Sequence, residues 1–191
     1  MNEDFEMIKA VLTELRSEYT VQCPFDVEEP EAPVTERDIV AEIRYRLKSF
    51  CRSRRYQVQC EIKPLFDHGA TPEYLKSPPR IDVVILSDTN DGTWLAAAKI
   101  LQDKFNKGSI KARFSSVPVL FFHTAIEVKI QSNVANAKED INTLRMIVDR
   151  NPFCNCFFVL LNARGRSQDH HHIQTYAHEK GICSIEYTSK K

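Results

Sequence analysis

The stretch Ile126-Glu127-Val128-Lys129-Ile130 predicts a β-strand that carries two charges on a single face. Side chains alternate across a strand, so the three aliphatic residues face one side while Glu127 and Lys129 share the other. The neighbouring sequence is strongly apolar, which is typical of a central strand. Charges on a central strand are costly unless they are paired or bind a metal ion. The stretch therefore indicates a functional site on a buried strand.

A second acid, Asp82, lies in an earlier apolar run over 80–87 that also predicts a strand. A helix expected over 35–53 adds Glu42 at the rim of its apolar stripe. We expect these carboxylates to converge with Lys129 at one edge of the sheet. Such a set suits phosphodiester hydrolysis, because oxygen ligands hold Mg²⁺ and a nearby lysine can orient or help deprotonate the attacking water.

The other elements follow from hydrophobic periodicity and from proline and glycine positions. The second half of the chain has a β-α-β order, which implies parallel pairing of its strands. The expected helices span 3–18, 35–53, 135–149 and 169–180, with an inserted helix over 92–107. The expected strands are 56–63, 80–87, one strand within 117–131, the run 157–161, and 182–187.

The pattern Asp82 … Glu127-Val128-Lys129 resembles the PD-(D/E)xK motif of restriction-endonuclease-like nucleases. The resemblance covers most of residues 35–187. It implies an α/β fold with a restriction-endonuclease-like core, in which a mixed central sheet is flanked by helices in the order α-β-β-β-α-β-α-β.

The resemblance also implies roles for individual residues. Asp82 and Glu127 would be ligands of Mg²⁺, for which Mn²⁺ can substitute, and Glu42 would be a further acid near or on the metal. The backbone carbonyl of Val128 completes such a site in many members, and Lys129 would serve the attacking water.

The sequence departs from the family pattern in three places. Pro79 lies three residues before Asp82 instead of directly before it. The distance to Glu127 is long because of an insertion expected over 88–116. Gln131 falls where several subfamilies carry a site glutamine, but no Q-x-x-x-Y motif follows it, which argues against the RecB-like exonucleases.

Charge is unevenly distributed although the formal net charge is zero. Acids crowd the stretch 26–38, and basic residues crowd 44–55. The basic stretch either contacts phosphates or is an ordinary solvated helix face. Arg46 in this stretch is a candidate for supporting the site or contacting substrate. Arg164 and Arg166 in a later loop are further candidates, with simple loop solvation as the alternative.

Other ionisable residues are expected to be structural. Glu139 and Asp140, on the helix after the motif, are expected at the surface. His123 is expected in the core or near the site, and residues 170–172, three histidines, are expected to open a helix.

Composition is ordinary for a globular chain of 191 residues, with 42% hydrophobic and 27% charged residues. It predicts one domain over 1–191, in which 1–34 form an N-terminal helix and an acidic, proline-containing linker. No apolar run approaches the ~20 residues that span a bilayer, and the N-terminus is acidic. We therefore expect a cytoplasmic protein with reduced cysteines and no membrane segment. The five glycines form no phosphate-binding loop, which excludes P-loop nucleotide hydrolysis.

Together these features predict a Mg²⁺-dependent endonuclease that hydrolyses phosphodiester bonds of DNA, in restriction, defence or repair. The alternative is a nuclease-fold module without catalysis that serves as a nucleic-acid-binding or assembly subunit. A third reading is an unrelated α/β protein, which a distance above roughly 8 Å between Asp82 and Glu127 would favour. The expected partners are DNA, a second copy in a homodimer, and a protein docked on the N-terminal helix.

Overall fold

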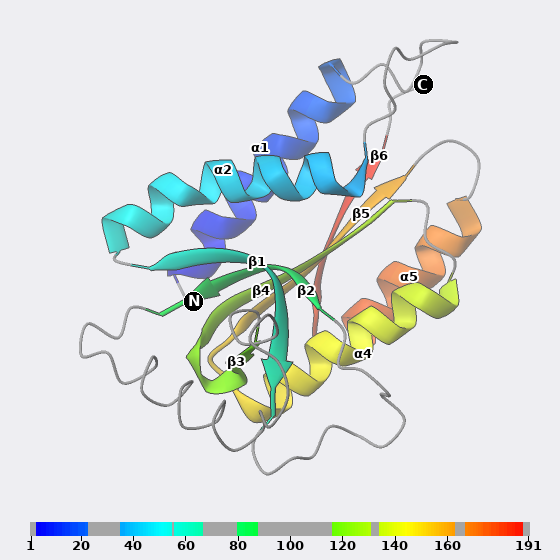
Figure 1. Ribbon diagram of the computed structural model, residues 1–191. Helices are drawn as coiled ribbons and strands as arrows, with labels where there is room; N and C mark the ends of the chain where they lie inside the picture. The colour runs from blue at the N-terminus through cyan, green and yellow to red at the C-terminus, as the bar shows by residue number, and fades with distance from the viewer. Residues whose placement is uncertain are drawn as a thin grey trace.

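The computed structural model describes residues 3–22, 35–54, 56–66, 80–87, 116–130, 134–162 and 167–188. Within these residues a six-stranded sheet lies between two helical layers (Figure 1). Helices α1 and α2 cover one face, and α4 and α5 cover the other. The predicted mixed α/β architecture is confirmed. The expected linker and inserted helix lie outside the described residues, as do Gln131, Arg164 and Arg166.

The helices begin and end near the expected residues: α1 spans Glu3–Gln22, α2 Glu36–Arg54, α4 Val134–Arg150 and α5 Ser167–Glu179. A capping box starts α2, because the Thr35 amide donates to Asp38 Oδ2 at 2.8 Å while Thr35 Oγ1 accepts from the Asp38 amide at 3.3 Å. Gly181, with a φ of 69°, ends the turn after α5. Local sequence signals therefore set these boundaries.

The strands are β1 (Gln57–Leu65), β2 (Ile81–Leu86), β3 (Ser116–Pro118), β4 (Phe122–Ile130), β5 (Asn155–Asn162) and β6 (Cys183–Thr188). Their order in the sheet is β3-β1-β2-β4-β5-β6. As the β-α-β order predicts, β4, β5 and β6 are parallel. Strands β1, β2 and β4 pair antiparallel, so the sheet is mixed.

The strand expected within 117–131 is confirmed as β4, but it begins only at Phe122. The chain forms the short edge strand β3, a 3-10 turn η3 (Val119–Phe121) and then β4. Pro118 cannot continue a ladder because it lacks an N–H group. The buried amide of Asn151 donates to the carbonyls of Val119 at 3.1 Å and Phe122 at 2.8 Å, which satisfies groups that the break leaves unpaired.

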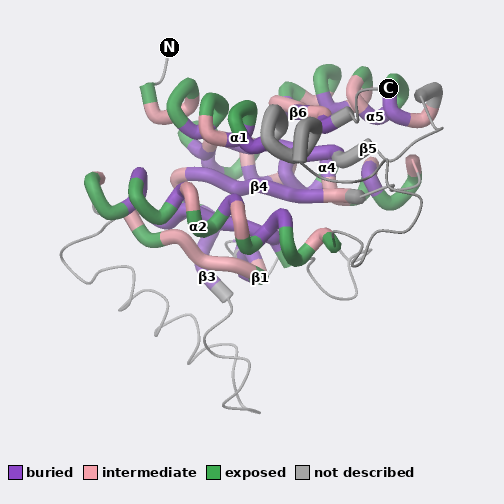
Figure 2. The backbone as a smooth tube through the Cα atoms, turned by 90° about the horizontal axis from the view of Figure 1, so that it is seen from above, coloured by how far each residue is buried: buried purple, intermediate pink, exposed green. Residues whose placement is uncertain are grey.

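Both faces of the sheet carry an apolar core (Figure 2). The stripe of α1 belongs to it, since Ile8, Leu12 and Leu15 are fully buried. The ring of Phe5 stacks on Phe157 with centroids 4.9 Å apart. This stripe therefore packs α1 onto the sheet, and a protein partner docked on the N-terminal helix stays a prediction.

The first turn of α1 is fixed by Asp4. Its carboxylate accepts hydrogen bonds from Arg54 Nε at 2.6 Å and from the Tyr56 hydroxyl at 3.1 Å, and it lies 3.1 Å from His123 Nε2. Burial alone would raise the pKa of Asp4, but these three partners lower it overall. Burial lowers the pKa of His123.

None of the helices in the described part of the chain has the length and apolarity to cross a bilayer. The cysteines in the same ranges (Cys51, Cys60, Cys154, Cys156 and Cys183) are free thiols.

Candidate active site

Two carboxylates face each other at the centre of the sheet. The antiparallel pairing of β2 and β4 sets Val83 opposite Ile126, and one further step along this register sets Asp82 opposite Glu127. The negative charge of Asp82 accordingly raises the pKa of Glu127, after the larger effect of burial. This arrangement removes the reading in which the acids lie on separate surfaces.

Asp82 also closes the end of the β2–β4 ladder. Backbone pairing of the two strands ends at Val83 and Ile126. Beyond that point the amide of Val128 donates to Asp82 Oδ2 at 2.7 Å. A carboxylate therefore takes the place of a strand carbonyl, and this bond fixes the orientation of Asp82 next to β4.

Glu127 is enclosed without sufficient partners. Its side chain is 1% exposed, and its Oε1 has no hydrogen-bond partner. Burial raises the pKa of Glu127 well above its usual range, and the charges of Asp82 and Asp140 raise it further, although Lys129 lowers it. A buried carboxylate oxygen without a partner is costly, and such an atom calls for an explanation such as a bound cation.

Lys129 connects the two helical layers at this point. Its Nζ lies 3.6 Å from Glu36 Oε1 of α2 and 3.5 Å from Asp140 Oδ2 of α4. Burial alone would lower the pKa of Lys129, but Asp140, Glu127 and Glu36 raise it to about 12. The ammonium therefore stays protonated at neutral pH and acts as a hydrogen-bond donor and positive charge.

Glu42 does not join this group. Its carboxylate accepts a hydrogen bond from Arg46 Nε at 2.7 Å, one turn further along α2. Residues of a helix are 100° apart, so Glu42 lies on the flank of α2 opposite Arg37 and Arg44, which share a groove with Asp82. The structure thus pairs the two candidates Glu42 and Arg46 with each other, and it sets a different glutamate of α2, Glu36, near Lys129.

Two acids that sequence analysis did not select are part of the site. Glu36 is four and seven residues before the buried Val40 and Ile43, so it continues their stripe toward β4. Asp140 precedes the buried Ile141 and lies at the border of the α4 stripe, which leaves its side chain 17% exposed. Burial raises the pKa of Asp140 to about 6, against the lowering effect of Lys129. The expectation of a surface acid is wrong for Asp140.

The donor set fits a small divalent cation. Among the residues that the structure describes, no three His, Cys, Asp or Glu side chains are arranged to hold a metal ion together. Mg²⁺ is commonly bound through one or two carboxylates and keeps several waters. Asp82 and the unpartnered oxygen of Glu127 supply that number of carboxylates, with Glu36 and Asp140 turned to Lys129 instead.

No family model matches the sequence, and no curated protein matches it. Three NucC structures share part of its backbone course. NucC of P. aeruginosa ATCC27853 in the cAAA-bound form is 10% identical with a TM-score of 0.49, over 97% of this chain and 76% of that one. The apo form of E. coli MS115-1 NucC is 12% identical with a TM-score of 0.46, over 93% of this chain and 74% of that one. Its cAAA-bound form is 10% identical with a TM-score of 0.47, over 95% of this chain and 74% of that one. At this identity the likeness concerns the course of the backbone alone.

Proposed function

We propose that this chain is a Mg²⁺-dependent nuclease that hydrolyses phosphodiester bonds of DNA. The observation that carries the proposal is the unpartnered buried oxygen of Glu127, which lies beside Asp82 and two residues before a charged lysine on the same strand. An apolar core gains nothing from such an arrangement. A divalent cation bound by both carboxylates would offset their repulsion and the burial cost.

The residues would divide the chemistry as follows. Asp82 and Glu127, with the carbonyl of Val128, would hold Mg²⁺ or Mn²⁺. The bound ion would polarise the phosphoryl group and lower the pKa of a coordinated water. Lys129, kept protonated by its acidic neighbours, would donate hydrogen bonds to the attacking water or to the phosphoryl oxygen on which charge develops.

A cleavage assay with matched variants tests this function. Wild-type protein should cleave single-stranded or duplex DNA with Mg²⁺ or Mn²⁺, and EDTA should stop the reaction. Asp82→Asn, Glu127→Gln and Lys129→Met should each lower the rate by about 100-fold or more. Glu42→Gln should retain activity, because that carboxylate pairs with Arg46. Intact DNA in every condition, together with no binding of divalent ions, would leave the non-catalytic module as the better reading.

A further inference from the structure

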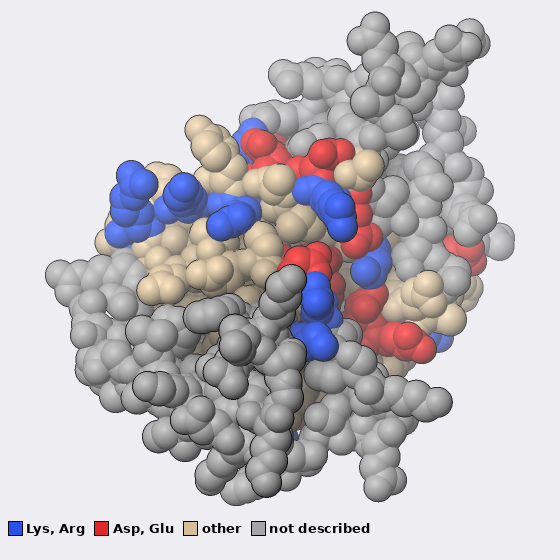
Figure 3. Space-filling model, viewed as in Figure 1, with Lys and Arg blue, Asp and Glu red and all other residues tan. Residues whose placement is uncertain are grey.

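A groove of about 650 Å³ lies between one flank of α2 and the strands β1 and β2, and Asp82 lines it. The helix contributes Arg37, Arg44, Tyr45 and Lys48 to its wall, together with Glu36 of its first turn, and Glu61 of β1 lies on the strand side. In Figure 3, basic side chains follow α2, and acidic side chains gather beside its first turns. The groove therefore leads directly to one of the two facing carboxylates.

The basic side chains of this wall are available. Arg37, Arg44 and Lys48 are exposed, and none of them has an ion-pair partner within the described ranges. On the opposite flank of the same helix, Arg46 is paired with Glu42. Cations without an acidic partner attract a polyanion. The flank of α2 that faces the groove therefore suits a polyanion better than the flank that carries Arg46.

The spacing of these cations suits one nucleic-acid strand. From Arg37 to Lys48 the helix rises about 16 Å, at 1.5 Å per residue. This length is enough for the three cations to meet successive phosphates of one strand, each of which carries a negative charge.

Tyr45 adds an aromatic surface between these cations. Its side chain is 74% exposed, although a large ring usually buries more of its surface. An exposed ring beside cationic groups is the arrangement on which single-stranded bases stack. Bases inside a duplex are covered on both faces by their neighbours, so the ring can receive a base only where the strand is unpaired.

We infer that this groove binds one DNA strand, with phosphates on Arg37, Arg44 and Lys48 and an unstacked base on Tyr45. The inference deepens the proposed function, since it gives that site a substrate with an unpaired segment. Binding itself requires no catalysis, so the two proposals can be tested separately.

The test is fluorescence anisotropy in EDTA with a labelled single-stranded oligodeoxynucleotide and with its duplex. Wild-type protein should bind the single strand more tightly. Tyr45→Ala should weaken that binding about tenfold and leave duplex binding unchanged. The triple variant Arg37→Ala, Arg44→Ala, Lys48→Ala should reduce the slope of log K against log salt by about 2, for three lost contacts with a single strand.

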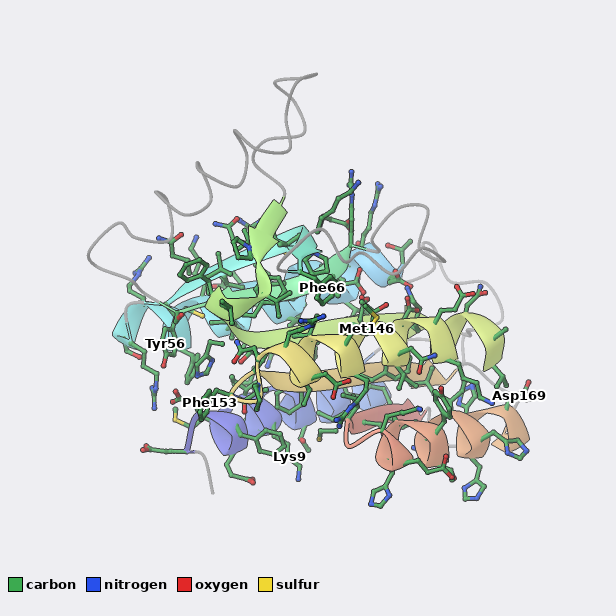
Figure 4. The ribbon with its side chains drawn as sticks, turned by 90° about the horizontal axis from the view of Figure 1, so that it is seen from below. Lys9, Tyr56, Phe66, Met146, Phe153 and Asp169 are labelled. Carbon is green, nitrogen blue, oxygen red and sulfur yellow. The ribbon has the colours of Figure 1, made fainter. Side chains whose placement is uncertain are left out.

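Phe153→Ala and Arg150→Ala are the matched controls. Phe153 is 88% exposed, and it lies at the opposite end of the molecule from Asp169 (Figure 4). Glu127 and Lys129 come late in β4, toward the end of the sheet where Asp169 lies, so Phe153 is far from the site. Both controls should bind like wild type, and melting temperatures should confirm that all variants fold, because the replaced side chains are exposed.

The outcomes separate the two proposals. The proposal that the groove binds a DNA strand is overturned if wild type and Tyr45→Ala have equal affinity for the single strand. It is also overturned if wild type binds neither oligonucleotide, even if DNA is cleaved. If binding follows the expected pattern but Mg²⁺ and Mn²⁺ give no cleavage, the strand-binding proposal is supported and the nuclease proposal is overturned.

Discussion

The ammonium of Lys129 lies 3.5 Å from a carboxylate oxygen of Asp140, so the strand that carries the motif is tied to the helix that follows it. The pair is partly enclosed, with side-chain exposures of 23% and 17%. Asp140 does not face Asp82 and Glu127 as a third donor. It holds the amine and helps to keep it charged, so in the proposed nuclease it would be a positioning residue.

Replacement of Asp140 by asparagine should lower kcat about 10- to 100-fold, because a misplaced catalytic group costs roughly that factor. The KM for DNA should change little, since Asp140 lies outside the basic groove. Steady-state cleavage rates measure both constants. Asp149→Asn is the control on the same helix, since Asp149 is exposed and pairs only with Arg145 among described residues. Equal rates for both variants would contradict the positioning role.

The same carboxylate predicts a pH dependence. The pKa of Asp140 is about 6, so this group gains a proton as the pH falls through that value and loses its attraction for Lys129. The cleavage rate of the wild type should therefore decline below about pH 6. A profile of kcat against pH at saturating Mg²⁺ shows this inflection, and Asp140→Asn should lack it. An unchanged inflection in the variant would assign it to another group.

Glu127→Gln should stabilise the metal-free chain while it abolishes cleavage. The pKa of Glu127 is higher in the folded state than in the unfolded one, so the folded state binds more protons between the two values. Wild-type stability should accordingly fall as the pH rises through that interval, and the variant should avoid this loss, about 1–2 kcal/mol.

Thermal melts in EDTA at several pH values measure the difference between the two proteins. Mg²⁺ should then raise the melting temperature of the wild type and have little effect on Glu127→Gln, because a ligand stabilises only the state that binds it. Parallel melting curves for the two proteins at all pH values, with and without Mg²⁺, would contradict the burial cost and the metal site together.

Asp4→Asn should destabilise the fold by about 1–3 kcal/mol, since it removes a charged acceptor shared by Arg54, Tyr56 and His123. Urea unfolding at neutral pH measures this loss. Glu3→Gln is a neighbouring control, because Glu3 is 86% exposed and 3.8 Å from Arg54, and it should cost less than about 0.5 kcal/mol. A similar small effect for both variants would show that the Asp4 cluster contributes little.

Asn151→Ala should cost about 2–3 kcal/mol, because the buried carbonyls of Val119 and Phe122 lose their donor. Asn142→Ala provides the comparison. Its amide accepts from the Tyr176 hydroxyl at 2.7 Å, but the pair is exposed, so the loss should stay under about 1 kcal/mol. Chemical denaturation of both variants decides whether the turn before β4 depends on Asn151.

Much of this architecture was predictable, because the relevant signals are local. Alternation places Glu127 and Lys129 on one face, and apolar runs with Asp82 among them indicate adjacent buried strands. The parallel pairing of β4, β5 and β6 follows from the intervening helices. The break before β4 was hidden, because the residues around Pro118 are uniformly apolar and the donor that supports the turn comes from Asn151, far along the chain.

The acids around Lys129 depend on how whole helices sit against the sheet. Glu42 and Glu36 both border the apolar stripe of α2, and the stripe alone does not tell which border faces β4. The structure settles it, because α2 places its first turn beside Lys129 and its last turn beside Asp4. Asp140 was missed for the same reason. A residue at the border of an apolar stripe is expected to be exposed, and only the packing of α4 beside Lys129 covers this one.

The hydroxyl of Tyr187 in β6 donates to the backbone carbonyl of Leu12 in α1, across a sequence separation of 175 residues. During synthesis, α1 emerges well before β6, which lies about 170 residues further along the chain. The side of α1 that packs on β6 must therefore stay exposed, or protected by chaperones, while the residues between them are synthesised. The closing of this large loop makes the docking of α1 on β6 a late step of folding.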